Sequence, residues 1–437
     1  MILKNKMTLL LALSLFFSAA SAQTAARKMT LDEVIQLALE NHTQLKLSRE
    51  NIQIAKQQTK IAELQKLPSV TASANAFYLG DALLLDKDLS KVTTIDMPHF
   101  GNTYSVQASE LIFKGGLVKK SIEMTELRTQ LAELDHEKDE QNIKFLVTSA
   151  YLDLQKIINQ KNVYLNNRKL ANERLENVKK FYKQGMVTRN EIIRGELFLK
   201  NLQQGILVLE NNRAALNYQL ATAIGTSPDV LIEPVTSLSA TPDHQLLQHY
   251  LDLAHQNHPV LKSAQTGIDI ANKNIEIIKT DKMPTIAAFG GYNMARPVTS
   301  SLPAKDLYTN TWQTGVSISY NIDNLYKTKE KEQLGKYQLN QAKDLLVLQQ
   351  QNLDVQTNAA YLKWQEALQQ AQLYKESEAL ANENYRIIEA KYLNQLALQA
   401  DITDATNAKL EAELQYANSE INVQYQYYNL MKTTGTL

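Results

Sequence analysis

The sequence is short of cysteine, proline and glycine: its 437 residues include no cysteine, nine prolines and fourteen glycines. Without cysteine the chain can form no disulfide, and no lipid can be attached through an N-terminal cysteine. Charge of one sign is also missing, because 46 basic residues balance 46 acidic ones. Binding to nucleic acid depends on a basic surplus, so we expect no nucleic-acid partner.

The few prolines leave two long stretches free of them. None lies between residues 99 and 227, and none follows residue 303. Proline inside a helix breaks it, so each stretch can hold long uninterrupted helices. A composition rich in Ala, Leu, Gln, Glu and Lys also favours helix. The sequence therefore predicts a mainly α fold with a small β part.

Residues 1–22 have the pattern of a secretory signal peptide. Lys4 and Lys6 form its basic start, residues 7–20 its apolar centre, and Ala20-Ser21-Ala22 a small-residue cleavage site. The apolar centre is shorter than the about 20 residues that cross a bilayer. We expect cleavage after Ala22, export from the cytoplasm and a lipid-free N-terminus, and we expect no transmembrane helix elsewhere.

The chain contains an internal duplication. Residues 31–68 align with residues 247–284 without a gap, and later residues align with those 210 positions further on, as Tyr151 does with Tyr361. This period is far longer than the 20–50 residues of solenoid repeats, so each copy must hold several elements. We predict a first structural repeat at 23–225, a linker at 226–243 and a second repeat at 244–437.

Each repeat is expected to begin with one amphipathic helix, 30–66 or 245–281, that a proline ends. Two strands joined by a loop follow, with the loops at 79–101 and 293–309. The strands alternate: Val70 and Ala72 share one face while Thr71 and Ser73 share the other. In a soluble sheet the apolar face covers a core, whereas in an outer-membrane barrel it faces lipid.

Two long helices complete each repeat. Apolar residues recur at alternating steps of four and three from Ile143 to Tyr182, and again from Leu353 to Tyr392. This 3.5-residue period predicts coiled-coil packing. If residues 117–184 form one helix, its length is roughly 100 Å at about 1.5 Å per residue.

A short turn joins the two long helices of each repeat. In the first turn we expect Gly185 to adopt the left-handed conformation and Thr188 or Asn190 to cap the next helix. In the second turn Gln395 stands where the glycine would be, and we expect Asn394 to be the left-handed residue.

Four strands are too few to enclose a pore. Lipid tolerates no open sheet edge, because unpaired backbone groups cannot bond to water there. Three chains would supply twelve strands, an even number within the known range of barrels. A membrane barrel therefore requires an oligomer.

Several motifs occur in a fixed order along both repeats. They are Ala38-Leu39 and Leu45 with their counterparts Ala254, Pro259, Val260 and Leu261, then Leu111-Ile112-Phe113-Lys114-Gly115-Gly116, Gly185-Met186-Val187-Thr188 and Gly435-Thr436-Leu437. With these motifs the chain resembles the TolC-like outer membrane efflux protein family over essentially the whole mature length. The second repeat departs from the pattern, because Asn321-Ile322-Asp323-Asn324 replaces the Gly-Gly motif.

The resemblance implies a homotrimer with a β-barrel in the outer membrane of a Gram-negative cell and an α-barrel across the periplasm. Such a protein is the exit duct of a tripartite efflux pump or a type I secretion system and exports small molecules or peptides. Its partners would be a periplasmic adaptor (membrane fusion) protein and an inner-membrane transporter. The alternative is a periplasmic coiled-coil adaptor or a structural or adhesin protein, which would need no lipid-facing strands.

The resemblance also implies a pore gate at the helix tips. Tyr392, Asp401 and Asp404 match the tyrosine and twin aspartates that constrict the family's periplasmic entrance, while Ala397 replaces the basic residue expected between them. The other expected gate residues are Asn190, Glu191, Arg189 and Arg194, and the expected adaptor contacts are Gly185, Met186, Val187, Thr188, Asn394, Gln395 and Leu396. Alternatively, the two aspartates are a solvated first-turn pair favoured by the helix dipole.

No motif points to catalysis, a cofactor or a metal. His249, His255 and His258 lie close in sequence, but His258 repeats as His42, where no second histidine is near. A buried or capping histidine explains this repetition better than a zinc site does. The sequence has no phosphate-binding glycine loop, nucleophile elbow or HExxH helix, so an enzyme is not expected.

Overall fold

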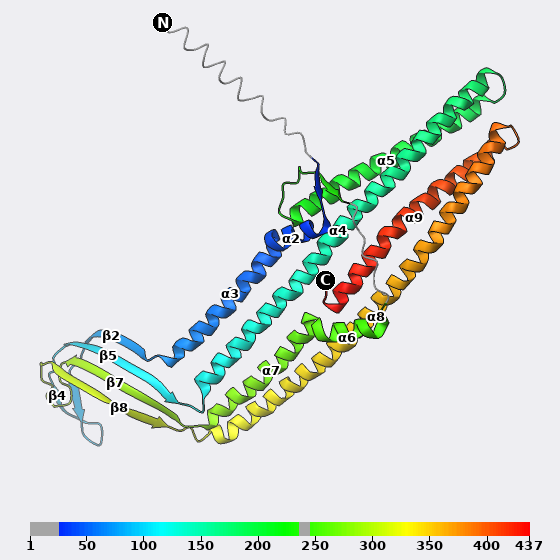
Figure 1. The fold of residues 1–437 in the computed structure, drawn as a ribbon. Helices are drawn as coiled ribbons and strands as arrows, with labels where there is room; N and C mark the ends of the chain where they lie inside the picture. The colour runs from blue at the N-terminus through cyan, green and yellow to red at the C-terminus, as the bar shows by residue number, and fades with distance from the viewer. Residues whose placement is uncertain (1–25, 236–244) are drawn as a thin grey trace, which may run out of the picture. The chain divides into compact units, whose positions relative to one another are not determined.

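The computed structural model describes residues 26–235 and 245–437, so the predicted signal peptide and part of the predicted linker lie outside the described residues. Figure 1 shows the arrangement of the elements. In chain order they are β1 (Arg27–Met29), α2 (Leu31–Asn41), α3 (Thr43–Glu63), β2 (Ser69–Tyr78), β3 (Ala82–Leu85), β4 (Lys91–Ile95), β5 (Phe100–Phe113), α4 (Leu117–Lys183), α5 (Arg189–Ala223), β6 (Ile232–Pro234), α6 (Leu247–Asn257), α7 (Pro259–Lys279), β7 (Thr285–Arg296), β8 (Thr309–Ser319), α8 (Asn324–Leu393) and α9 (Gln399–Thr434).

The mainly α fold and the long uninterrupted helices are confirmed. Helix α4 has 67 residues and α8 has 70. Most of the predicted apolar seam is buried in both helices, for example Val147 and Leu154 in α4 and Trp364 in α8. Among the described residues, no helix combines the length and the apolar character needed to cross a membrane.

Two compact units share the chain. One comprises residues up to Arg49 with 135–262 and 348–437, and the other comprises 50–134 with 263–347. Each unit draws on both halves of the sequence. The predicted boundaries of the two repeats stay a prediction.

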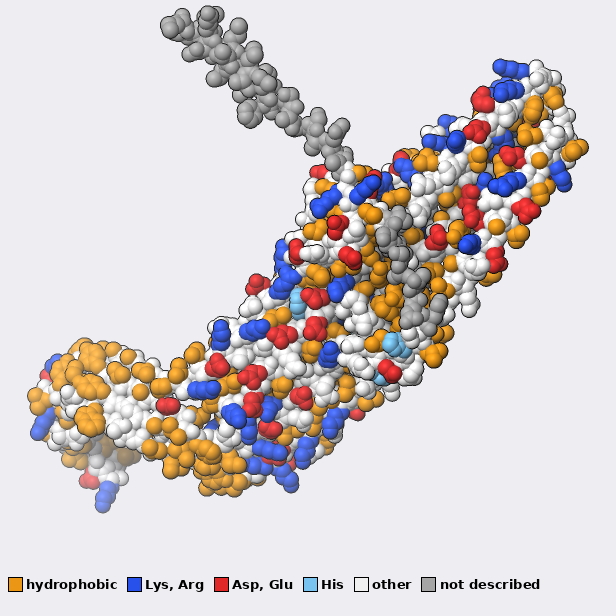
Figure 2. All heavy atoms as spheres, in the orientation of Figure 1, with side chains coloured by type: hydrophobic (Ala, Val, Ile, Leu, Met, Phe, Trp, Pro, Cys, Tyr) orange, Lys and Arg blue, Asp and Glu red, His pale blue; other side chains and the backbone are white. Residues whose placement is uncertain are grey.

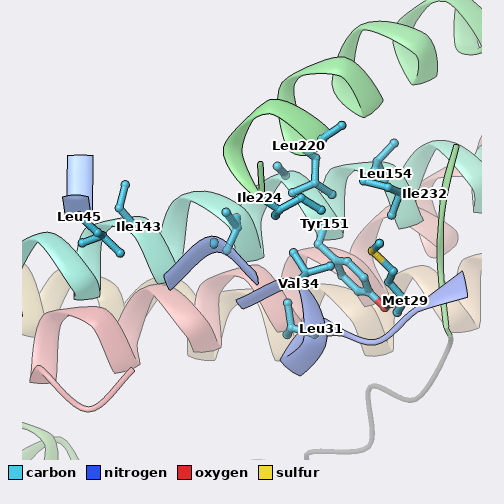
Figure 3. Close-up of a cluster of buried hydrophobic side chains, with 14 residues drawn as sticks. Met29, Leu31, Val34, Leu45, Ile143, Tyr151, Leu154, Leu220, Ile224 and Ile232 are labelled. Carbon is cyan, nitrogen blue, oxygen red and sulfur yellow. Dashed lines mark hydrogen bonds between the residues drawn. The ribbon is translucent and has the colours of Figure 1, made fainter. Parts of the chain in front are cut away.

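The core of the first unit gathers around Tyr151 (Figure 3). The Tyr151 hydroxyl donates a hydrogen bond to the Met29 carbonyl at 3.0 Å and accepts one from the Val235 amide at 3.0 Å. It thereby connects α4 to the short parallel strands β1 and β6. These strands have three residues each, too few to show an alternating pattern in the sequence.

The prediction of one helix at 30–66 and another at 245–281 is wrong. Each breaks at a histidine, His42 or His258, whose backbone is extended. The Nδ1 atom of His42 accepts the Gln44 amide at 3.2 Å, and that of His258 accepts the Val260 amide at 3.3 Å. The two histidines thus end one helix and cap the next, and burial lowers the pKa of both, which favours the neutral ring that can accept.

A glycine after the last helix of each half of the sequence packs against the break in the first helix of that half. Gly225 and Gly435 both have positive φ, of 72° and 71°. A Cβ added to Gly435 would lie 2.9 Å from the His258 Cα, and one added to Gly225 would lie 2.6 Å from the Asn41 Cβ. The last turns of α5 and α9 therefore approach the broken helices so closely that a side chain would not fit.

Candidate membrane-facing sheet and channel entrance

The second unit contains an antiparallel sheet in the order β2-β5-β7-β8. Its register places Ser73 opposite Ser105, Ser105 opposite Asn293, and Asn293 opposite Thr311. Most side chains on this face are polar or small, and within the ladder none is charged. Phe77, Leu111 and Phe289 are the large apolar exceptions. The face comprises Ser69, Thr71, Ser73, Asn75, Phe77, Gly101, Thr103, Ser105, Gln107, Ser109, Leu111, Thr285, Ala287, Phe289, Gly291, Asn293, Ala295, Thr309, Thr311, Gln313, Gly315, Ser317 and Ser319.

The opposite face of the sheet is apolar and uncovered. Trp312, Val316 and Ile318 are 77%, 65% and 72% exposed, and Tyr104 and Tyr292 lie on the same face. Glu110 and Arg296 stand near opposite ends of this face and bound an uncharged band between them. Figure 2 shows hydrophobic side chains gathered over the strands, whereas charges cover the helices.

The two outer strands of this sheet, β2 and β8, each pair with a single neighbour. Their other edges therefore carry backbone groups that no strand of the same sheet satisfies. Such an edge is ready to pair with another strand.

The loops at one end of the sheet are shorter than predicted. The expected loop 79–101 contains a hairpin of β3 and β4, and the expected loop 293–309 begins only after β7 ends at Arg296. Arg296 donates two hydrogen bonds to Asp306, at 2.6 and 2.8 Å, and Asn102 donates one to the Tyr308 hydroxyl at 3.1 Å. These bonds hold the second loop against β5 and β7. Strand β7 therefore extends to Arg296, further than predicted.

The first helical turn, between α4 and α5, matches the prediction. Gly185 has φ of 74°, and Thr188 occupies the N-cap position of α5, although its side chain makes no capping bond. The Gly185 amide donates to the Tyr182 carbonyl at 3.0 Å, and the Met186 amide donates to the Phe181 carbonyl at 2.9 Å. These bonds satisfy the last carbonyls of α4.

In the second turn, between α8 and α9, the prediction for Asn394 is wrong. The left-handed residue is Gln395, with φ of 65°. Its amide donates to the Tyr392 carbonyl at 3.0 Å, and the Leu396 amide donates to the Lys391 carbonyl at 2.8 Å, as in the first turn. The hydrogen bonds of the helix end thus fix the position, and they outweigh the preference of asparagine for this conformation.

The predicted gate residues Tyr392 and Glu191 lie in contact. The Tyr392 hydroxyl donates to Glu191 Oε2 at 2.8 Å. Tyr392 is only 8% exposed and packs with Val178, Tyr385 and Ile402. Burial and the hydrogen bond to Glu191 raise the pKa of Tyr392, so the hydroxyl keeps its proton and donates it.

The remaining predicted gate residues do not meet within one chain. Asp401 and Asp404 are exposed, and Asp401 Oδ2 accepts the Leu398 amide at 2.9 Å, which caps the start of α9. Asn190, Arg189 and Arg194 are also exposed, and in the described chain neither arginine forms an ion pair. Within one chain, Asp401 and Asp404 are thus an exposed pair in the first turn of α9, and their role in a gate between copies stays a prediction.

A stripe of polar contacts that the sequence did not predict joins the two helical hairpins, α4–α5 and α8–α9. Gln160, Asn167 and Arg174 of α4 lie at intervals of seven residues. Their side chains donate to Asn418 at 2.7 Å, Glu413 at 2.6 Å and Thr406 at 2.6 Å, all in α9. The heptad spacing beside the apolar seam was the signal that could have revealed it.

Comparison with known proteins agrees with this geometry. The sequence model of the family described as outer membrane efflux protein matches residues 250–436. Outer membrane efflux protein BepC of Brucella suis is 21% identical over 418 residues, covering 94% of this chain and 87% of BepC.

Solved structures of outer-membrane channels share the fold. The outer-membrane channel OprN has a TM-score of 0.77 at 14% identity, over 93% of this chain and 90% of its own. CusC, described in a study of transmembrane channel formation, has a TM-score of 0.77 at 15% identity, over 92% of this chain and 91% of its own. Together with the family match, this fold confirms the resemblance seen in the sequence. The chain is therefore similar to TolC-like outer membrane efflux proteins in its second half and has the fold of outer-membrane channels over its length.

Proposed function

We propose that this chain is one subunit of a homotrimeric outer membrane channel, the exit duct of a tripartite efflux pump or a type I secretion system. The sheet carries this proposal. Its apolar face is exposed and bears Trp312, Tyr104 and Tyr292, its other face is mostly polar and uncharged, and both of its edges are open. Lipid on one side and water on the other suit these faces.

Closure of the sheet sets the number of copies. If β8 of one copy pairs with β2 of the next, no backbone group stays unpaired in lipid. Three copies give twelve strands around a lumen lined by the Ser, Thr, Asn and Gln side chains described above. A small molecule or peptide would cross a lumen without fixed charge in this ladder.

The long helices provide the periplasmic part of the proposed duct. Hairpins α4–α5 and α8–α9 from three copies would line an α-barrel, as the seam and the polar stripe support. The exposed turn residues Met186 and Leu396 offer apolar contacts to a periplasmic adaptor protein, which would connect the duct to an inner-membrane transporter. Gly185, Val187, Thr188, Asn394 and Gln395 complete these contact surfaces.

The gate belongs to the same proposal. A threefold axis would assemble rings of Asp401 and Asp404 at the entrance, while Tyr392 and Glu191 hold adjacent hairpins together. Rings of like charge bind cations, so multivalent cations should block the closed entrance.

Bilayer recording of the protein extracted from outer membranes tests the proposal. We expect cation-selective channels that multivalent cations block. Replacing Asp401→Asn with Asp404→Asn should abolish the block but keep the cap of α9, and Asp88→Asn in the β3–β4 turn should not change it. A chain recovered as a soluble monomer without detergent would contradict the barrel and favour the periplasmic adaptor or adhesin alternative.

A further inference from the structure

The two helical hairpins present matching positions to different surroundings. Residues of the first hairpin recur 210 positions later in the second, so Glu191 corresponds to Asp401 and Tyr182 to Tyr392. Within one chain, one flank of the first hairpin contacts one flank of the second. Glu191 pairs with Tyr392, and Arg174 and Asn167 pair with Thr406 and Glu413.

The matching residues on the other flank of each hairpin are uncovered in a single chain. The positions matching these three contacts are Asp401 with Tyr182, Asn384 with Glu196, and Ser377 with Gln203. All six residues are exposed, whereas the corresponding residues in the contacts seen are buried or partly buried. Tyr182 illustrates the difference, because it is 44% exposed and Tyr392 is 8% exposed.

The chemistry of these uncovered residues is complementary. Each of the three matched pairs joins a hydrogen-bond donor to an acceptor: a hydroxyl to a carboxylate, an amide to a carboxylate, and a hydroxyl to an amide. The next pair along the stripe, Gln370 with Val208, is not complementary, so the match is confined to the tip half of the hairpins.

Asp401 has capacity for a further donor. Its Oδ2 already accepts the Leu398 amide, while among the described contacts its Oδ1 accepts nothing. Glu191, at the matching position, receives the Tyr392 hydroxyl. A tyrosine hydroxyl brought to Asp401 would complete the same arrangement.

We propose that in the assembled channel the hydroxyl of Tyr182 donates to the Asp401 carboxylate of the neighbouring copy. This inference rests on the proposed trimer and adds to it a specific contact between copies. Tyrosine–carboxylate pairs within chains and between chains would then alternate around the entrance. Ala397 supplies no basic partner at this point, and Glu196 with Asn384 would support the pair between chains further from the tip.

Cross-linking can test the contact directly, because the chain has no cysteine of its own. We would combine Tyr182→Cys with Asp401→Cys and treat outer membranes with a bifunctional thiol reagent that spans a tyrosine–carboxylate pair. Covalent dimers and trimers are expected. The matched control, Glu191→Cys with Tyr392→Cys, should cross-link only within one chain.

A second control separates failure of this contact from failure of the trimer. Cysteine pairs that combine Ala74 in β2 with each of Trp312, Val316 and Ile318 in β8, all on the same face, should include a sheet pair that cross-links neighbouring copies. If the sheet pair cross-links copies and the Tyr182–Asp401 pair does not, the inference is wrong and the trimer stands. If neither pair cross-links copies, the proposed function is contradicted as well.

Channel recording gives an independent readout. Loss of a hydrogen bond to a carboxylate, about 1.5–3 kcal/mol per contact, should raise the equilibrium constant for channel opening at least about tenfold. Tyr182→Phe and Tyr392→Phe should therefore have similar effects, and Asp88→Asn in the β3–β4 turn should have little. A channel that Arg194→Gln opens and Tyr182→Phe does not would overturn the proposal in favour of an arginine contact.

Discussion

The tips of the two helical hairpins carry similar residues at matching positions but differ in burial and in hydrogen bonding. Tyr182 and Tyr392 occupy matching positions, yet only Tyr392 is buried and bonded to a carboxylate. Glu191 and Asp401 also match, yet Glu191 bonds to the other hairpin and Asp401 to its own helix. The comparison teaches that the duplicated sequence supplies two equivalent sets of groups, and that one chain covers only one of them.

Substitutions in the buried apolar seam should have the largest effect on stability, and they test whether the two hairpins are packed equally. Trp364 and Leu154 occupy matching positions, and both side chains are fully buried. Trp364→Ala should lower the free energy of unfolding by about 3–5 kcal/mol and Leu154→Ala by about 2–5 kcal/mol, because each leaves a cavity. Thermal unfolding followed by the helical circular dichroism signal would measure both. A loss below about 1 kcal/mol at either position would mean that the seam is not a packed core there.

The hydroxyl of Tyr392 provides the next largest effect. Tyr392→Phe leaves the Glu191 carboxylate without its donor, and we expect a loss of about 1.5–3 kcal/mol, as for hydrogen bonds to charged groups. Chemical unfolding would measure the loss. Tyr374→Phe serves as the control, since this seam tyrosine is only partly buried. Equal stability of the two variants would show that the Tyr392–Glu191 bond contributes nothing.

Acidification should lower the free energy of unfolding through the histidines at the two helix breaks. Burial lowers the pKa of His258 in the folded chain, with Lys432 contributing. Because the unfolded histidine binds its proton near pH 6.5, the stabilisation is complete above that pH and is lost as the pH falls below it towards the lowered pKa. The slope cannot exceed about 1.4 kcal/mol per pH unit for one proton.

Unfolding measured between pH 7 and pH 5 tests this expectation. His258→Asn keeps a side-chain acceptor for the Val260 amide and should flatten the pH dependence. The exposed His249→Asn should not change it. If His258→Asn keeps the full slope, other groups cause it.

The two turns offer the smallest effect. Both Gln395 and Gly185 have a left-handed backbone, which destabilises the chain at glutamine but not at glycine. Gln395→Gly should therefore stabilise the chain by about 1 kcal/mol, and Gly185→Gln should destabilise it by a similar amount. Thermal unfolding of both variants measures the difference. Destabilisation by Gln395→Gly would show that the side chain contributes more than its backbone costs.

Much of the fold could be predicted because it depends on periodic patterns. The 3.5-residue seam predicted α4 and α8, and alternation predicted β2 and β8. The apolar periodicity continues across His42 and His258 and hides the two breaks. Pro259 could have revealed the second break, because proline disfavours helix at the residue before it, and the duplication would then have placed the first break at His42. For Asn394, a single-residue preference gave the wrong answer, and the register of the duplication would have given Gln395.

The gate was only partly predictable for a related reason. The resemblance identified Tyr392 and Glu191, which the structure brings together. The polar stripe of Gln160, Asn167 and Arg174 depends on which flank faces the second hairpin, and that is decided by tertiary packing. The roles of Asp401, Asp404, Arg189 and Arg194 depend on neighbouring copies, so they stay predictions.

The central claim is that three copies of this chain close one barrel in a membrane. An electron cryomicroscopy reconstruction of the protein in lipid nanodiscs tests it most directly. The account predicts a threefold particle in which β8 of each copy pairs with β2 of the next to form twelve continuous strands, with Trp312 towards lipid and Gln313 towards the lumen. Separate four-stranded sheets, another number of copies, or Gln313 towards lipid would contradict it.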